Sequence, residues 1–151
     1  MSIFKKLSHM LNASSPVKIP KPEGERLAAA VLMVEVAAND GEISRIEREQ
    51  ILHLLEHKLG LSSEEAIELF VEALGVRNES NQMVTFTREI KNHFDEGGRE
   101  NILEMMWEVA FADGKADSYE SNLLRRVTGL LYISDVRSGQ IRKNVMAKLG
   151  L

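Results

Sequence analysis

The sequence predicts an all-α protein, a single-domain bundle of about seven helices. Aromatic residues make up only 5% of the 151 residues, whereas Leu, Ala, Met and Glu are plentiful, and this balance favours helix over strand. Apolar residues recur at helical spacing, and no convincing alternating run occurs. A nearly all-apolar helix followed by Asp-Gly, a short turn and a second helix occurs twice, so we expect an internal pseudo-twofold repeat of helix-turn-helix hairpins.

Residues 1–22 are expected to lie outside the main domain, which comprises residues 23–151. Five apolar residues recur at helical spacing near the N-terminus, which predicts a short amphipathic helix: Ile3, Phe4, Leu7, Met10 and Leu11. All three prolines fall within residues 14–22, a composition typical of an extended linker. Residues 1–13 are expected to pack on the main body or on a second copy of the chain, or to associate weakly with a membrane.

Helical periodicity in the main domain predicts helices at about 23–38, 44–60, 62–75, 83–94, 99–112, 117–131 and 134–148. Ser62 and Glu65 have the spacing of a capping box, in which each side chain accepts a hydrogen bond from the other residue's backbone N–H. Gly75 is expected to end the third helix before a polar connection, and Gly97-Gly98 to interrupt the chain before the fifth. The first and fifth helices are apolar nearly all round, so we expect them to be central and buried.

Glu35 and Glu108 each interrupt one of these apolar helices. A buried carboxylate must be paired or protonated, so we expect buried ion pairs that fix the positions of the helices. On sequence grounds the partners are Arg88, Arg125 and Arg126.

The two Asp-Gly turns have a structural interpretation. Gly41 and Gly114 can adopt the positive φ that ends a helix. Ser44 with Glu47, and Asp117 with Glu120, have the spacing of capping boxes that start the next helix. This interpretation leaves the repeated Asp before Gly unexplained.

A second interpretation is a metal site. The Asp-Gly turns match positions five to twelve of a calcium-binding EF-hand loop, with Asp40 and Asp113 at position five and Glu47 and Glu120 at position twelve. Positions one and three are apolar: Val36 and Ala38 in one copy, Val109 and Phe111 in the other. The alternative to two capped turns is therefore a site for calcium or a similar divalent ion, shared between the turns. Its candidate ligands are Asp40, Glu47, Asp113, Glu120 and also Asp117.

A third interpretation is an acidic surface for a basic protein partner, which would form if the two hairpins pack together. Its acidic side chains are Glu35, Asp40, Glu42, Glu47, Asp113, Asp117 and Glu120. On the second helix, His53 and His57 have a spacing compatible with metal binding. They fall on its expected solvent face, so a solvated face is the preferred interpretation.

Composition excludes several classes of function. A net charge of −4 argues against nucleic acid as a partner, because binding phosphates needs a cationic face. The absence of cysteine excludes disulfides, thiolate metal sites and a Cys nucleophile. No phosphate-binding loop, zinc-protease motif or nucleophile elbow occurs, so we do not expect an enzyme. No signal peptide is evident, so we expect a cytoplasmic protein, or one peripheral at the inner membrane.

Five further segments form a recognisable set: Ala38-Asn39-Asp40-Gly41-Glu42-Ile43-Ser44, Phe86-Thr87-Arg88, Val109-Ala110-Phe111-Ala112-Asp113-Gly114-Lys115, Leu123-Leu124-Arg125-Arg126 and Leu130-Leu131-Tyr132-Ile133-Ser134-Asp135. Together they resemble the TerB-like family of tellurite resistance proteins. The resemblance implies an all-α fold and a stress-response role as a non-enzymatic accessory or scaffold protein. It also directs the suspicion of metal binding to Asp40, Glu47, Asp113 and Glu120. A peripheral membrane adaptor, targeted by the N-terminal helix, is the alternative function.

Overall fold

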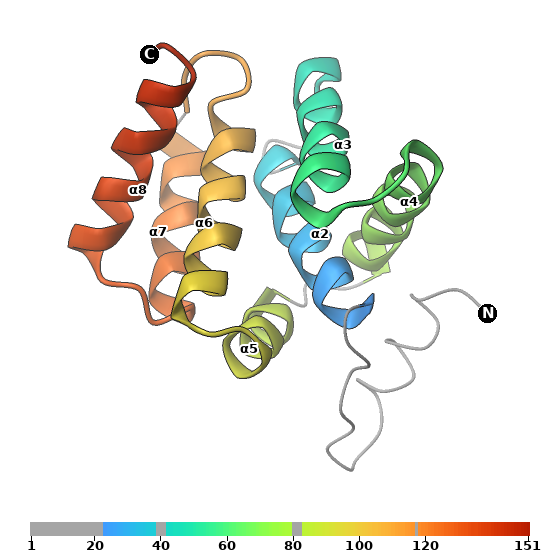
Figure 1. Cartoon of the computed structure of the whole chain (residues 1–151), viewed down its shortest axis with the longest axis horizontal. Coiled ribbons are helices and arrows are strands. Elements are labelled where there is room, and N and C mark those ends of the chain that lie inside the picture. The colour runs from blue at the N-terminus through green and yellow to red at the C-terminus, as the bar shows by residue number, and fades with distance from the viewer. Residues whose placement is uncertain (1–22, 39–41, 80–82, 117) are drawn as a thin grey trace.

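The computed structural model describes residues 23–38, 42–79, 83–116 and 118–151. These residues form seven helices and no strand, which confirms the predicted all-α fold (Figure 1). The helices are α2 (Glu23–Ala37), α3 (Arg45–Leu59), α4 (Ser63–Glu79), α5 (Met83–His93), α6 (Glu96–Ala110), α7 (Ser118–Leu130) and α8 (Asp135–Lys148). The predicted N-terminal helix and linker lie outside the described residues, as do Asp40, Gly41 and Asp117.

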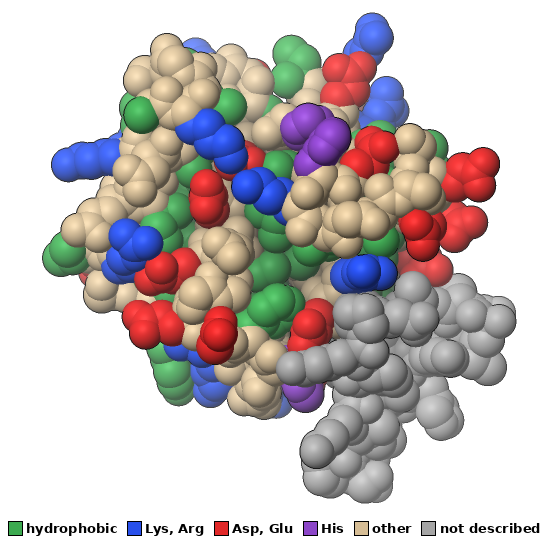
Figure 2. Space-filling model, viewed as in Figure 1, with side chains coloured by type: hydrophobic (Ala, Val, Ile, Leu, Met, Phe, Trp, Pro, Cys, Tyr) green, Lys and Arg blue, Asp and Glu red, His purple; other side chains and the backbone are tan. Residues whose placement is uncertain are grey.

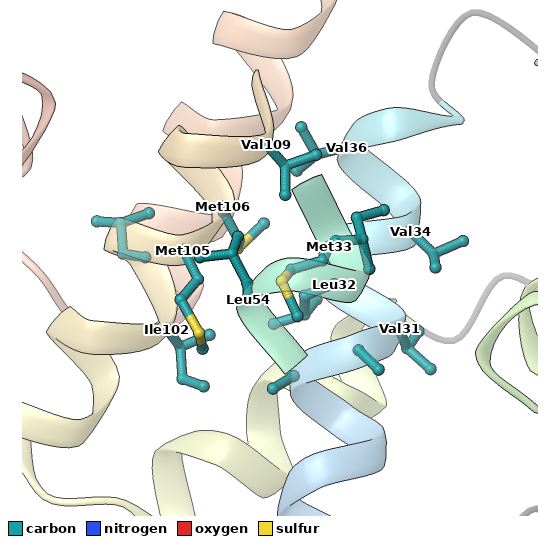
Figure 3. Packing of buried hydrophobic residues seen from close by; sticks show 14 of the residues in the cluster. Val31, Leu32, Met33, Val34, Val36, Leu54, Ile102, Met105, Met106 and Val109 are labelled. Carbon is teal, nitrogen blue, oxygen red and sulfur yellow. The ribbon is translucent and has the colours of Figure 1, made fainter. Parts of the chain in front are cut away.

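Helices α2 and α6 form the centre of the bundle (Figure 1). Helix α2 packs against α3, α4, α5, α6 and α7, and α6 also packs against α3, α7 and α8. Figure 3 shows Met33 of α2 pointing toward Met106 of α6 and Leu54 of α3, while Val31 and Val34 point to the other side of α2. All five side chains are at most 2% exposed. Helix α2 is therefore buried on both sides, and in α6 every residue from Met105 to Ala110 is buried, as predicted for two central helices.

Side-chain caps begin α3, α4 and α8. In two of the three predicted capping boxes, Glu47 N–H donates to Ser44 Oγ and Glu65 N–H to Ser62 Oγ, both at 3.1 Å, and the glutamates accept in return at 3.0 Å. The third, Asp117 with Glu120, includes a residue outside the described ranges. Ser134 caps α8 by accepting from Arg137 N–H at 3.1 Å. These local hydrogen bonds explain why the starts of these helices are readable from the sequence.

The prediction that Gly75 ends a helix is wrong. Helix α4 continues through Gly75 to Glu79, so most of the predicted polar connection is helical. Beyond the glycine, Val76 is buried and Arg77 lies 3.5 Å from Glu35 of α2, measured from Nε to Oε1. These tertiary contacts outweigh the helix-weakening effect of one glycine, about 1 kcal/mol.

Gly97 and Gly98 do not interrupt the chain either, because both lie in the first turn of α6. Asp95 caps this helix by accepting from Gly98 N–H at 2.8 Å. A Cβ atom on Gly98 would lie 2.7 Å from Cδ1 of Phe94, so the close approach of Phe94 explains a glycine there. The predicted start of the fifth helix is therefore about one turn too late.

Glu35 and Glu108 do form ion pairs, but the partners predicted for them are wrong. Glu35 pairs with Arg77, and Glu108 accepts a hydrogen bond from Lys148 Nζ at 2.6 Å. Burial raises the pKa of Glu35 above its usual value, and the nearby Arg77 guanidinium partly offsets this. The hydrogen bond to Glu108 raises the pKa of Lys148. Both cations come from helix ends that only the packing of the bundle brings near.

The face shown in Figure 2 is mixed in charge: acidic and basic side chains are interspersed over the helices, with hydrophobic side chains visible between them. Within the described ranges, no helix has the length and apolar character needed to cross a membrane.

Candidate functional site: an acidic pocket between two turns

The turn after α6 has the positive φ predicted at Gly114, but this glycine does not end the helix, because α6 ends at Ala110 with Phe111 as its C-cap. Gly114 has a φ of +99°, in the left-handed region that glycine tolerates. Its N–H donates to the carbonyl of Phe111 at 2.9 Å, which closes the turn. Asp113 is exposed, and its Oδ1 lies 3.4 Å from Lys115 N–H, a long hydrogen bond. The carboxylate of Asp113 therefore stays available on the surface of the turn.

The first turn is described from Glu42 onward. Glu42 is exposed, and Ile43 packs against the hydrophobic core. Glu47 uses Oε1 in the capping box of α3, which leaves Oε2 outside the capping hydrogen bonds. On this side, the acidic groups are therefore held at the N-terminal end of α3, where the helix dipole favours negative charge.

The two turns line one pocket of about 310 Å³. Its lining residues come from the end of α2, the first turn, the start of α3, the second turn and α7: Val36, Ala37, Glu42, Ile43, Ser44, Glu47, Asp113 and Glu120. Glu120 is only 7% exposed. The structure thus brings together three of the predicted ligands, Glu47, Asp113 and Glu120.

Glu42 is a fourth acidic residue in the pocket, and the predicted ligand set omits it. Glu42 could have been predicted from its position inside the turn. The EF-hand pattern assigns this position to a backbone carbonyl ligand, so the pattern draws no attention to the side chain. Glu35, part of the predicted acidic surface, is instead paired with Arg77 and does not line this pocket.

The apolar residues at positions one and three of the EF-hand pattern are buried in the structure. Val36 and Val109 are both fully buried, and in Figure 3 they point toward one another between α2 and α6. Ala38 is buried, and Phe111 stacks on Trp107 with 5.7 Å between ring centroids. None of these side chains offers an oxygen ligand. The pattern thus matches an EF-hand only over its second half.

The described carboxylates do not converge as a preformed ligand set. In the part of the chain that the structure describes, no three His, Asp or Glu side chains are grouped so as to hold a metal ion. Two of the predicted ligands, Asp40 and Asp117, lie outside that part. His53 and His57 are exposed on α3, with ring centroids 4.3 Å apart.

The predicted pseudo-twofold relation between the hairpins stays a prediction. Both turns contribute to one pocket, but Asp40 and Gly41 of the first lie outside the described residues. The two turns therefore cannot be compared residue by residue.

Comparison with known proteins identifies one family. The family model described as "Tellurite resistance protein TerB" matches residues 26–143, which span α2 to most of α8. No curated protein and no solved structure gives a match.

Proposed function

The chain belongs to the TerB family of tellurite resistance proteins, and on that premise we propose that it is a non-enzymatic accessory protein of the stress response that binds a divalent cation in the acidic pocket. The observation that carries the proposal is the lining of this pocket by four acidic side chains from two turns far apart in the sequence. Hard cations such as calcium prefer oxygen ligands of this kind.

The described residues would supply part of the coordination shell. Calcium takes about 6–8 oxygen ligands in a flexible arrangement, often including water. A pocket of about 310 Å³ has room for an ion that keeps several waters. Asp40 and Asp117 belong to the same two turns in sequence, and we expect them to complete the shell. Such a site would form fully only when the ion draws the carboxylates together.

Calorimetry with calcium, magnesium, manganese and zinc tests the proposal. Glu47→Gln and Asp113→Asn remove charge but keep an oxygen that can accept the backbone hydrogen bonds of Ser44 and Lys115. We expect each variant to bind the preferred ion at least about tenfold more weakly. Glu68→Gln on the exposed face of α4 is the matched control and should bind as the parent does.

Two results would contradict this function. One is no measurable heat with any of the four ions, and the other is undiminished affinity in both pocket variants. A basic segment of a protein partner is the alternative occupant, since the same carboxylates attract Lys and Arg. A partner captured equally well with and without a chelator, but lost in Glu47→Gln and Asp113→Asn, would favour this alternative.

The membrane adaptor depends on residues 1–11, which lie outside the described residues, and it stays a prediction. Liposome flotation of the full chain, compared with a chain lacking residues 1–15, tests it. We expect the shortened chain to lose any flotation that the full chain shows, because the apolar face of the helix would supply the attachment. A full chain that never floats would exclude the adaptor.

A further inference from the structure

A second pocket, of about 600 Å³, lies among the three C-terminal helices of Figure 1. Helix α6 contributes Trp107, α7 contributes Ser121, Arg125 and Thr128, and α8 contributes Asp135, Ser138, Gly139 and Arg142. Its volume falls within the range of about 300–1,000 Å³ that is usual for small-molecule sites. No residue of this pocket belongs to the acidic pocket between the turns.

The pocket has a mixed lining, in which polar side chains of α7 and α8 lie beside the indole of Trp107. On α8, the four lining residues have the spacing i, i+3, i+4, i+7, so they share one side of the helix. A buried contact joins α7 to α8 in this pocket, because Thr128 Oγ1 lies 3.2 Å from Ser138 Oγ. Thr128 Oγ1 also donates to the Leu124 carbonyl at 2.6 Å. Both residues are buried, so their hydroxyl groups form the polar inner part of the pocket.

Two guanidinium groups, those of Arg125 and Arg142, line the pocket together with one carboxylate, Asp135, and both arginines are exposed. Among the described residues, neither Arg125 nor Arg142 forms an ion pair, whereas Arg137 on another side of α8 binds Glu100 at 3.0 Å. Arg142 lies instead over aromatic rings, 5.7 Å from the centroid of Trp107 and 5.5 Å from that of Phe111. Guanidinium groups bind phosphate oxygens in a bidentate geometry.

The pocket also contains an indole N–H without a partner, on Trp107, and an open space beside Gly139. The indole Nε1–H of Trp107 is shielded from solvent and has no hydrogen-bond partner in the described part of the chain. A Cβ atom on Gly139 would have no neighbour within 4 Å, so no packing contact requires a glycine in the middle of α8. Its lack of a side chain leaves space at the wall of the pocket.

We propose that this pocket binds a small phosphate monoester that carries hydroxyl groups, such as a sugar phosphate. Arg125 of α7 and Arg142 of α8 bind the phosphate. Asp135 would repel a bare anion, but its carboxylate accepts hydrogen bonds from ligand hydroxyl groups, as Ser121 can too. Binding at Arg142 changes the surroundings of the Trp107 ring, because this guanidinium lies over the ring.

Tryptophan fluorescence gives a direct test, because Trp107 is the only tryptophan of the chain. We expect glucose 6-phosphate to change the emission in a saturable way, inorganic phosphate to bind more weakly, and glucose to have no effect. Arg125→Gln should weaken the binding of glucose 6-phosphate at least about tenfold, measured by fluorescence and calorimetry. Gly139→Leu should abolish it, because the new side chain extends into the pocket.

Arg126→Gln is the matched control, since Arg126 is the exposed neighbour of Arg125 and does not line the pocket. Far-UV circular dichroism of each variant verifies its fold. Arg125→Gln removes a charge, whereas Gly139→Leu fills space, so if one variant misfolds the other still tests the proposal. No saturable signal with about 10 mM glucose 6-phosphate or phosphate would overturn the proposal. Equal affinity for the two ligands would overturn the assignment to an ester, and equal loss in Arg125→Gln and Arg126→Gln would overturn the assignment to this pocket.

Discussion

Glu108 is a carboxylate on the buried side of α6, and its side chain is only 2% exposed. The ammonium group of Lys148, at 2.6 Å, compensates for the loss of water around this charge. Glu35 is held less tightly, because Arg77 Nε lies 3.5 Å from its Oε1 while Nη2 of the same arginine donates to the carbonyl of Ala38. The sequence identified both carboxylates as groups that need partners. Their partners depend on packing between helices distant in sequence.

Glu108→Gln is expected to lower the free energy of unfolding by about 1–3 kcal/mol, because it removes the charge from a buried, charge-assisted hydrogen bond. Chemical denaturation measures the loss. Glu104→Gln is the control: Glu104 lies 3.9 Å from the same Lys148 Nζ but is 34% exposed, so its loss should be smaller. An unchanged midpoint in Glu108→Gln would contradict the role assigned to this ion pair.

At the scale of single helices, starts were more predictable than ends. Ser44 and Ser62 identify helix starts because the capping bonds join residues three apart in sequence. The end of α4 depends on the burial of Val76 and on Arg77 reaching α2, and neither contact is visible in the local sequence. Gly98 differs, because its close neighbour is the ring of Phe94, only four residues earlier in the chain.

Gly98→Ala should destabilise the start of α6 by about 1–3 kcal/mol, because its Cβ would lie 2.7 Å from the ring of Phe94. Gly97→Ala is the matched control in the same turn, where the nearest atom is Asp95 Oδ1 at 3.6 Å, an ordinary contact. It should stay within about 0.5 kcal/mol of the parent. Thermal unfolding of the pair checks this, and equal losses would exclude the steric explanation.

At the scale of the whole molecule, α2 and α6 share one core. Helix α2 belongs to the N-terminal part and α6 to the C-terminal part, yet they pack directly on each other, and α2 also contacts α5 and α7. The acidic pocket follows from this packing, since Val36 and Asp113 both line it. Neither part therefore buries its apolar surface alone.

We expect the protein to unfold in a single cooperative transition. Trp107 on α6 reports the C-terminal part by fluorescence, and circular dichroism at 222 nm reports all helices, so the two urea transitions should coincide. A fragment of residues 83–151 should be unstable, because it lacks the α2 surface on which α6 packs. Two separate transitions, or a stably folded fragment, would contradict a shared core.

The sequence by itself determined the helical class, the central position of the two apolar helices and the capped starts of α3, α4 and α8. It also identified the two Asp-Gly turns as the candidate site. These properties follow from periodicity and from hydrogen bonds between near neighbours, which the local chain specifies. Tertiary structure decided that Arg77 and Lys148 pair with the buried carboxylates, that Glu42, Glu47, Asp113 and Glu120 line one pocket, and that Arg125 and Arg142 line another. Such groupings join residues from different helices, and their distances are set by how the core packs rather than by their spacing along the chain.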